Sequence, residues 1–72
     1  MTVQIKAVAG EDMQTGQAIR VEVNDGEYVA RRALTIGKVA ATATEDIKVG
    51  DRLIFEGDFI RKAVGDEWSK LP

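Results

Sequence analysis

Apolar and polar side chains alternate along much of the chain. Ile5 and Ala7 share one phase near the N-terminus, and Ile19, Val21 and Val23 share one phase further on. A period of two with β-branched residues is typical of strands that bury one face. The pattern predicts about six or seven short strands, at residues 2–8, 18–23, 28–33, 34–36, 38–43, 52–55 and 59–64.

Glycines separate these strands. Asp25-Gly26 is a strong signal for a two-residue hairpin turn, and Glu56-Gly57-Asp58 predicts a second tight turn. Two further glycines, Gly16 and Gly50, each end an acidic segment. Each of these segments is expected to form a single helical or 3₁₀ turn that closes on a glycine with left-handed backbone. In the second segment, the Thr44 hydroxyl is expected to accept an N–H near residue 47 as the helix cap.

The sequence Val-Ala-Ala-Thr-Ala at residues 39–43 allows two interpretations. Alanine favours helix, but so short a stretch has neither a cap nor a charged face to support one. We therefore expect a buried strand of small side chains that packs closely against a neighbour.

The pattern occurs twice in the chain. When Ala9 is aligned with Ala43, the first Glu-Asp pair and its glycine align with the second Glu-Asp pair and its glycine. After a longer first hairpin, Tyr28 aligns with Phe59, and one further gap aligns residues 31–34 with residues 61–64. Chance similarity between two hairpins is the alternative to duplication. A unit of this size cannot bury its own apolar face, whereas two units that face each other can.

The repeat therefore predicts an all-β fold. We expect a small barrel or sandwich of about six or seven short strands, built from two similar turn-strand-hairpin units, with at most one or two single helical turns. Residues 1–65 are expected to form a single β-domain and residues 66–72 a C-terminal tail.

Length and composition restrict the function. A chain of 72 residues forms one domain, and folding at this size buries only about 60% of the surface of the unfolded chain. The chain has no Cys and no His, which excludes disulfides, the usual zinc ligand sets and histidine-based catalysis. We expect a partner subunit to supply stability, and a well-packed monomer is the alternative.

Charge and hydropathy exclude two kinds of partner. The net charge is −2, with acids and bases interspersed, whereas nucleic-acid binders carry a basic excess. No apolar run approaches the roughly 20 residues that span a bilayer, and the N-terminal residues lack the features of a signal peptide. We therefore expect no nucleic-acid partner, no membrane insertion and no export by that route.

The paired carboxylates Glu11-Asp12 and Glu45-Asp46 are the motif closest to a catalytic or metal-binding pair. Both functions need several oxygen atoms that converge on one point, and the start of a capped turn explains the acids locally. The glycines match no phosphate-binding motif. The sequence therefore predicts no catalytic, cofactor-binding or metal-binding residues, and no enzyme.

Six residues are candidates for contact with another protein. Trp68 and Leu71 lie in the C-terminal tail, where the indole either packs back on the barrel or docks on another subunit. The other four are the basic pairs Arg31-Arg32 and Arg61-Lys62. These side chains either meet an acidic protein surface or are ordinary solvated charges on strands.

Two segments resemble the small capsid decoration (cement, or head-stabilising) proteins of tailed bacteriophages. The segment AGEDMQTGQAI at residues 9–19 is similar to the family pattern A-x-E-D-x-x-x-G-x-A-V, and GEYVA at residues 26–30 is similar to the hairpin that follows it. Residues 36–53 are similar to the family pattern I-G-x-A-x-x-x-x-x-D-I-x-x-G-D-x-V. The resemblance covers most of residues 7–64 and leaves out the N-terminal strand and the Trp68 tail. Similar turns occur in β-clip domains of the SAF type.

The resemblance implies a non-enzymatic structural protein of the phage head. Such a protein is made in the host cytoplasm, binds the outer surface of the capsid through the major capsid protein and stabilises the lattice, often as a trimer. The alternative, from the β-clip likeness, is a module that binds a small ligand or a carbohydrate.

Overall fold

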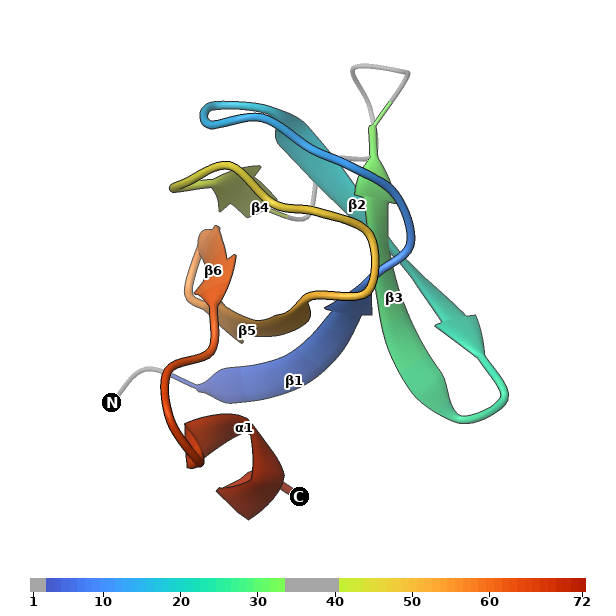
Figure 1. Cartoon of the computed structure of the whole chain (residues 1–72). Helices are drawn as coiled ribbons and strands as arrows, with labels where there is room; N and C mark the ends of the chain where they lie inside the picture. The colour runs from blue at the N-terminus through green and yellow to red at the C-terminus, as the bar shows by residue number, and fades with distance from the viewer. Residues whose placement is uncertain (1–2, 34–40) are drawn as a thin grey trace.

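The alternating stretches of the sequence form strands that close into a barrel. The structure, a computed structural model, describes residues 3–33 and 41–72. These residues contain six strands and one helical turn, which confirms the prediction of a small all-β barrel (Figure 1). The elements are β1 (Gln4–Ala9), β2 (Ala18–Asn24), β3 (Glu27–Arg32), β4 (Ala41–Ala43), β5 (Arg52–Glu56), β6 (Phe59–Lys62) and α1 (Glu67–Lys70).

The strand order around the barrel is β1-β3-β2-β4-β6-β5. The small-residue stretch is a strand where it is described, since β4 buries Ala41 and Ala43. The strand expected at residues 34–36, and the start of the one expected at 38–43, lie outside the described residues. The predicted Asp25-Gly26 turn is confirmed. Its two residues have φ of 52° and 80°, as a type I′ hairpin turn requires.

Strand pairing shows the duplication. β1 pairs in parallel with β3, with Ala9 opposite Ala30, and β4 pairs in parallel with β6, with Ala43 opposite Ile60. Ala30 therefore corresponds to Ile60, and the alignment of Tyr28 with Phe59 is wrong by one residue. The first hairpin is longer by two residue pairs. Because of this difference in length, the sequence alone does not show which residue of β3 corresponds to which residue of β6. The corrected register needs no second gap before the basic pairs.

The helical turns expected at residues 11–15 and 44–49 do not form. Neither segment contains helix. The two meet at Met13 and Ile47, whose backbone N–H groups each donate to the other's carbonyl at 2.8 Å. This pairing buries both side chains, at 2% and 1% exposure, and satisfies amides that a single helical turn would leave open. The Thr44 hydroxyl donates to the Ile60 carbonyl instead of capping a helix.

The barrel interior is filled by small and branched apolar side chains from both units. They are Ala7, Ala9, Met13, Ile19, Ala30, Ala41, Ala43, Ile47, Leu53, Phe55 and Ile60. Ile54 is also fully buried but is not part of this cluster. Its side chain points outward from β5, because alternate strand residues face opposite sides. The element that contacts β5 on that side is α1. The segment expected to be a tail therefore contains a helical turn that covers the outside of the barrel (Figure 1).

Candidate interaction surface

The acidic turns bind each other's backbone. Asp12 Oδ1 accepts the Val49 N–H at 2.8 Å, and Asp46 Oδ1 accepts both the backbone N–H and the hydroxyl of Thr15 at 2.9 Å. These bonds hold the pKa of Asp46 below its ordinary value, chiefly through the Thr15 N–H. The carboxylates thus have a structural role, as expected. They cap the turn of the opposite unit, however, and not the segment in which they lie.

The neighbouring glutamates hold two of the four basic residues that the sequence singled out. Glu11 accepts a hydrogen bond from Arg32 Nε, and this bond is the main cause of the lowered pKa of Glu11. In the equivalent position of the second unit, Glu45 accepts the backbone N–H of Lys62 at 3.2 Å, and its other oxygen lies 4.0 Å from Lys62 Nζ. Arg32 and Lys62 therefore each meet an acid of their own chain.

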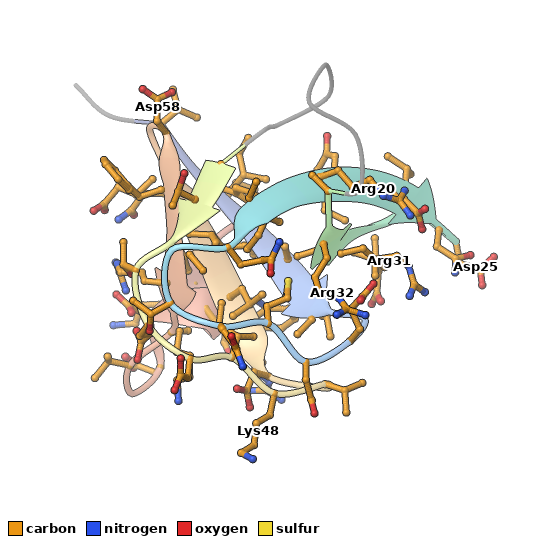
Figure 2. All side chains as sticks on the ribbon, turned by 90° about the horizontal axis from the view of Figure 1, so that it is seen from above. Arg20, Asp25, Arg31, Arg32, Lys48 and Asp58 are labelled. Atoms are coloured by element: carbon orange, nitrogen blue, oxygen red, sulfur yellow. The ribbon has the colours of Figure 1, made fainter. Side chains whose placement is uncertain are left out.

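Arg31 and Arg61 are paired with acids in the same way. Arg31 Nε donates to Glu22 at 2.9 Å. Glu22 also binds Arg20, and its pKa is lowered chiefly by the hydrogen bond from Arg20 and then by the one from Arg31. Figure 2 shows Arg20, Arg31 and Arg32 on the same side of the barrel. Whether this side meets a partner stays a prediction, but the basic residues there are already engaged.

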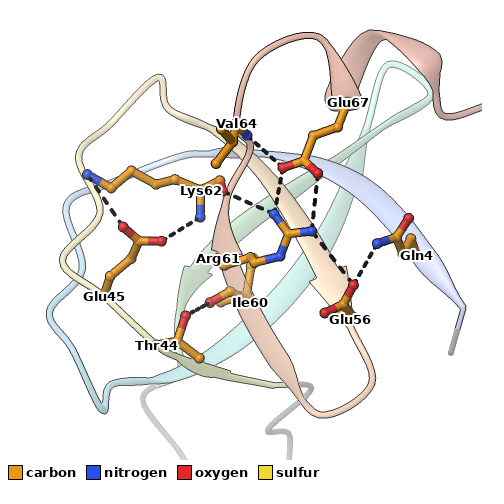
Figure 3. Close-up of polar contacts among 9 residues, drawn as sticks. All are labelled: Gln4, Thr44, Glu45, Glu56, Ile60, Arg61, Lys62, Val64 and Glu67. Carbon is orange, nitrogen blue, oxygen red and sulfur yellow. Dashed lines mark hydrogen bonds and ion pairs between the residues drawn. The ribbon is translucent and has the colours of Figure 1, made fainter.

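Arg61 lies at the centre of a cluster at the other end of the chain (Figure 3). Its guanidinium donates to both oxygens of Glu67, at 2.6 and 3.3 Å, and lies 3.7 Å from Glu56. The hydrogen bonds with Glu67 raise the pKa of Arg61, and the Arg61 guanidinium lowers the pKa of Glu67. Glu67 also accepts the Val64 N–H at 2.6 Å. Arg61 thus fixes the start of α1 on the barrel.

Trp68 lies against its own barrel. Its Nε1 donates to the Ala7 carbonyl at 2.9 Å, and its ring has Lys6 Nζ at 4.7 Å and the Arg52 guanidinium carbon at 5.0 Å from the centroid. Both distances are within the range of cation–π contacts. The side chain is half-buried, as is that of Leu71, whose backbone N–H bonds to the Trp68 carbonyl. Of the two placements that the sequence left open for the indole, the structure has the one on β1 and β5.

A groove of about 220 Å³ lies beside Trp68. One wall is the hairpin between β2 and β3, the floor is β1, and the other wall is the C-terminal segment. Its lining residues are Ile5, Lys6, Ala7, Val8, Gly26, Glu27, Tyr28, Trp68 and Pro72. The groove exists because β1 pairs with β3 only at Val8 and Ala9. The preceding residues of β1 pair with β5 alone, so their other edge faces the groove.

Sequence reasoning missed Lys6, which lines this groove, and Arg52, which lies beside it at the Trp68 ring. Neither forms an ion pair with a described residue, unlike the four basic residues that the sequence singled out. They are 46 positions apart, and the register of β1 on β5, with Val8 opposite Arg52, brings them together. The alternation in the sequence indicated that Lys6 points away from the core, but it did not indicate that Arg52 lies nearby.

Two other kinds of feature are not found among the residues that the structure describes. They contain no cluster of three acidic side chains that could hold a metal ion. Residues 3–33 and 41–72 also include no helix of the length and apolarity that would cross a membrane. Comparisons of the chain with protein-family models, curated proteins and solved structures find no match.

Proposed function

We propose that the chain is a non-enzymatic structural protein that binds the outer surface of a bacteriophage capsid and stabilises the head lattice. The main support is the placement of the two segments that resemble decoration proteins. Their Glu-Asp turns occupy equivalent positions and cap each other across the Met13–Ile47 contact. The Glu-Asp turns that carry the resemblance are thus joined by hydrogen bonds in one part of the barrel.

The paired acids support a structural role over a catalytic one. Asp12 and Asp46 hold backbone amides, and Glu11 holds Arg32. A general acid or base needs a proton that it can exchange with a substrate, whereas the hydrogen bonds that Glu11 and Asp46 accept lower the pKa values of these two carboxyls. In this proposal the major capsid protein is the partner, and the protein reaches the virion from the host cytoplasm.

The test uses expanded heads and procapsids of the phage whose genome carries this gene beside a major capsid protein gene. The purified protein is mixed with each particle and sedimented. Saturable binding to expanded heads, with weaker binding to procapsids, is the expected result. Heads incubated with the protein should also retain their DNA at temperatures at which bare heads lose it. Equal absence of binding to both particles would refute the proposal.

A second candidate, a module that binds a small ligand or a carbohydrate, is favoured by the groove. Tyr28 and Trp68 both line it, and aromatic walls with a few polar groups are typical of small-ligand sites. A glycan array separates the two candidates. A specific glycan that quenches Trp68 fluorescence, together with no binding to heads, would favour the ligand-binding module.

A further inference from the structure

The hairpin between β2 and β3 carries apolar side chains beyond the end of the barrel. Val23 and Tyr28 face each other across its last residue pairs and share a side with the buried Ala30, since alternate residues on a strand share a side. Ala30 is fully buried, but Val23 is 70% and Tyr28 44% exposed. An apolar pair on the core-facing side of a sheet, left in solvent, indicates a surface that something else covers.

The tip of this hairpin is acidic. Asp25 and Glu27 are exposed, and neither forms an ion pair with any described residue. Glu27 lines the groove together with Lys6, yet the two are not paired within one chain.

The side of the groove next to Trp68 is basic. Lys6 and Arg52 both lie at the Trp68 ring and have no acidic partner among the described residues. Two cations at one ring repel each other, and an added carboxylate would relieve that repulsion. The surface that runs from the hairpin tip across the groove to Trp68 is therefore acidic, then apolar, then basic.

We propose that this surface joins two copies of the chain around a two-fold axis, with the hairpin of each copy lying in the groove of the other. A two-fold interface uses the same patch on both subunits, so that each residue pair occurs twice. A patch that is acidic at one end, apolar in the middle and basic at the other end is complementary to itself under this rotation. Glu27 of each copy then meets Lys6 of the other, and the Val23–Tyr28 pair covers Ile5 and its own equivalent.

A second copy fits this surface better than an unrelated acidic protein. An acidic peptide would neutralise Lys6 and Arg52 but leave Val23 and the hairpin acids without partners. The β2–β3 hairpin of a second copy supplies both the carboxylates for the cations and an apolar surface for the Val23–Tyr28 pair. The interface also adds buried apolar surface to a domain of only 72 residues, which is the size at which association commonly supplements a small core. It does not depend on capsid binding.

Charge reversal tests the proposed contact. Analytical ultracentrifugation should show a dimer of the unmodified protein. Lys6→Glu and Glu27→Lys should each raise the dimer dissociation constant by roughly tenfold or more, because each places like charges together twice. An equimolar mixture of the two variants should recover the dimer as a one-to-one heterodimer, since both contacts then again join opposite charges. That recovery distinguishes a lost contact from a damaged fold.

Two matched variants serve as controls. Lys48→Glu and Asp58→Lys reverse exposed charges that lie far from the hairpin tip, as Figure 2 shows relative to Asp25. Neither variant should change the dimer dissociation constant. Trp68 is the single tryptophan, so its emission should also move to shorter wavelength on association, and the shift should disappear on dilution.

Several results would overturn the proposal. A monomer at concentrations up to about 1 mM would do so, as would a trimer, whose odd number of subunits does not fit a two-fold patch. Failure of the mixed variants to associate would equally refute it. A monomer whose Trp68 fluorescence responds to a polyglutamate peptide would show that an acidic partner, and not a second copy, occupies the groove. Head binding is measured separately, so either proposal can fail without the other.

Discussion

Gly50 provides the most direct test of the turn geometry. Its φ is 89°, and the turn is closed by the Asp51 N–H donating to the Lys48 carbonyl at 3.0 Å. A Cβ added at this residue would have no heavy atom within 4 Å. Gly50→Ala therefore introduces no steric overlap with other residues, and its effect reports the backbone conformation alone.

The expected cost of Gly50→Ala follows from two opposing effects. An L-residue with left-handed backbone is destabilised by roughly 1–2 kcal/mol. The reduced freedom of the unfolded chain offsets about 0.4–1 kcal/mol of this. We expect a net loss of about 1 kcal/mol in the free energy of unfolding, which lowers the melting temperature of a domain this size by about 4–8 °C. Gly50→Val should lose about 1–3 kcal/mol, because a branched side chain is more restricted.

Chemical synthesis of the chain allows a matched pair of variants. D-alanine at residue 50 adopts positive φ without strain, so it keeps the entropic gain and should be as stable as glycine or more stable by about 0.4–1 kcal/mol. The two alanine epimers have the same composition and differ only in the handedness of one carbon. Urea unfolding at one protein concentration measures the difference between them, with the slope m expected to be unchanged.

The refuting result is equal stability of the L- and D-alanine proteins. It would mean that residue 50 does not have positive φ and that the turn does not have the left-handed backbone described for it. The duplication supplies an internal repeat of the test. Gly16 has φ of 83° and equally open space around it, so its epimer pair should differ by a similar amount.

Three further predictions concern the turns and the C-terminal segment. Asp46→Ala and Asp12→Ala should each lower the urea midpoint of unfolding, Asp46→Ala by more, since Asp46 binds two groups of Thr15 and Asp12 binds one amide. An unchanged midpoint for either variant would contradict capping between the units. The pKa values of Glu11, Glu22, Asp46 and Glu67 are lowered by native bonds. Their contribution to stability is therefore fully present above the ordinary values of 4.5 for Glu and 3.8 for Asp and is lost as the pH falls through the lower folded values; an unfolding midpoint that does not decrease in acid would be inconsistent with these bonds. Trp68→Phe should cost about 1 kcal/mol through loss of the bond to the Ala7 carbonyl, and Trp68→Ala should cost more in the same thermal or urea assay; a neutral Trp68→Ala would show that the indole does not pack on the barrel.

The strands and hairpin turns were predictable because their signals are local. Alternation marks a strand within a few residues, and Asp25-Gly26 specifies its turn by backbone preference alone. The repeat then indicated two units that close on each other. These features needed no knowledge of which strand lies beside which.

The surface features were not predictable, because each depends on pairing between distant residues. Asp12 reaches the amide of Val49, 37 positions away, so the acids were assigned to the nearest turn. Lys6 and Arg52 become neighbours only once the register of β1 on β5 is fixed. The role of Arg61 likewise depends on where α1 lies, and a four-residue helix has too short a pattern to be recognised.

The reciprocal capping of the two turns has a consequence for how the chain folds. Each half of the barrel supplies carbonyls and carboxylates that complete the hydrogen bonds of the other half. A half-formed barrel would thus leave backbone amides without acceptors on both sides, so a partly folded state has little to stabilise it. Folding must first close a loop of more than thirty residues, which is slow relative to forming a single hairpin. We therefore expect the barrel to fold cooperatively, as two small units in one chain whose interlocked turns form together.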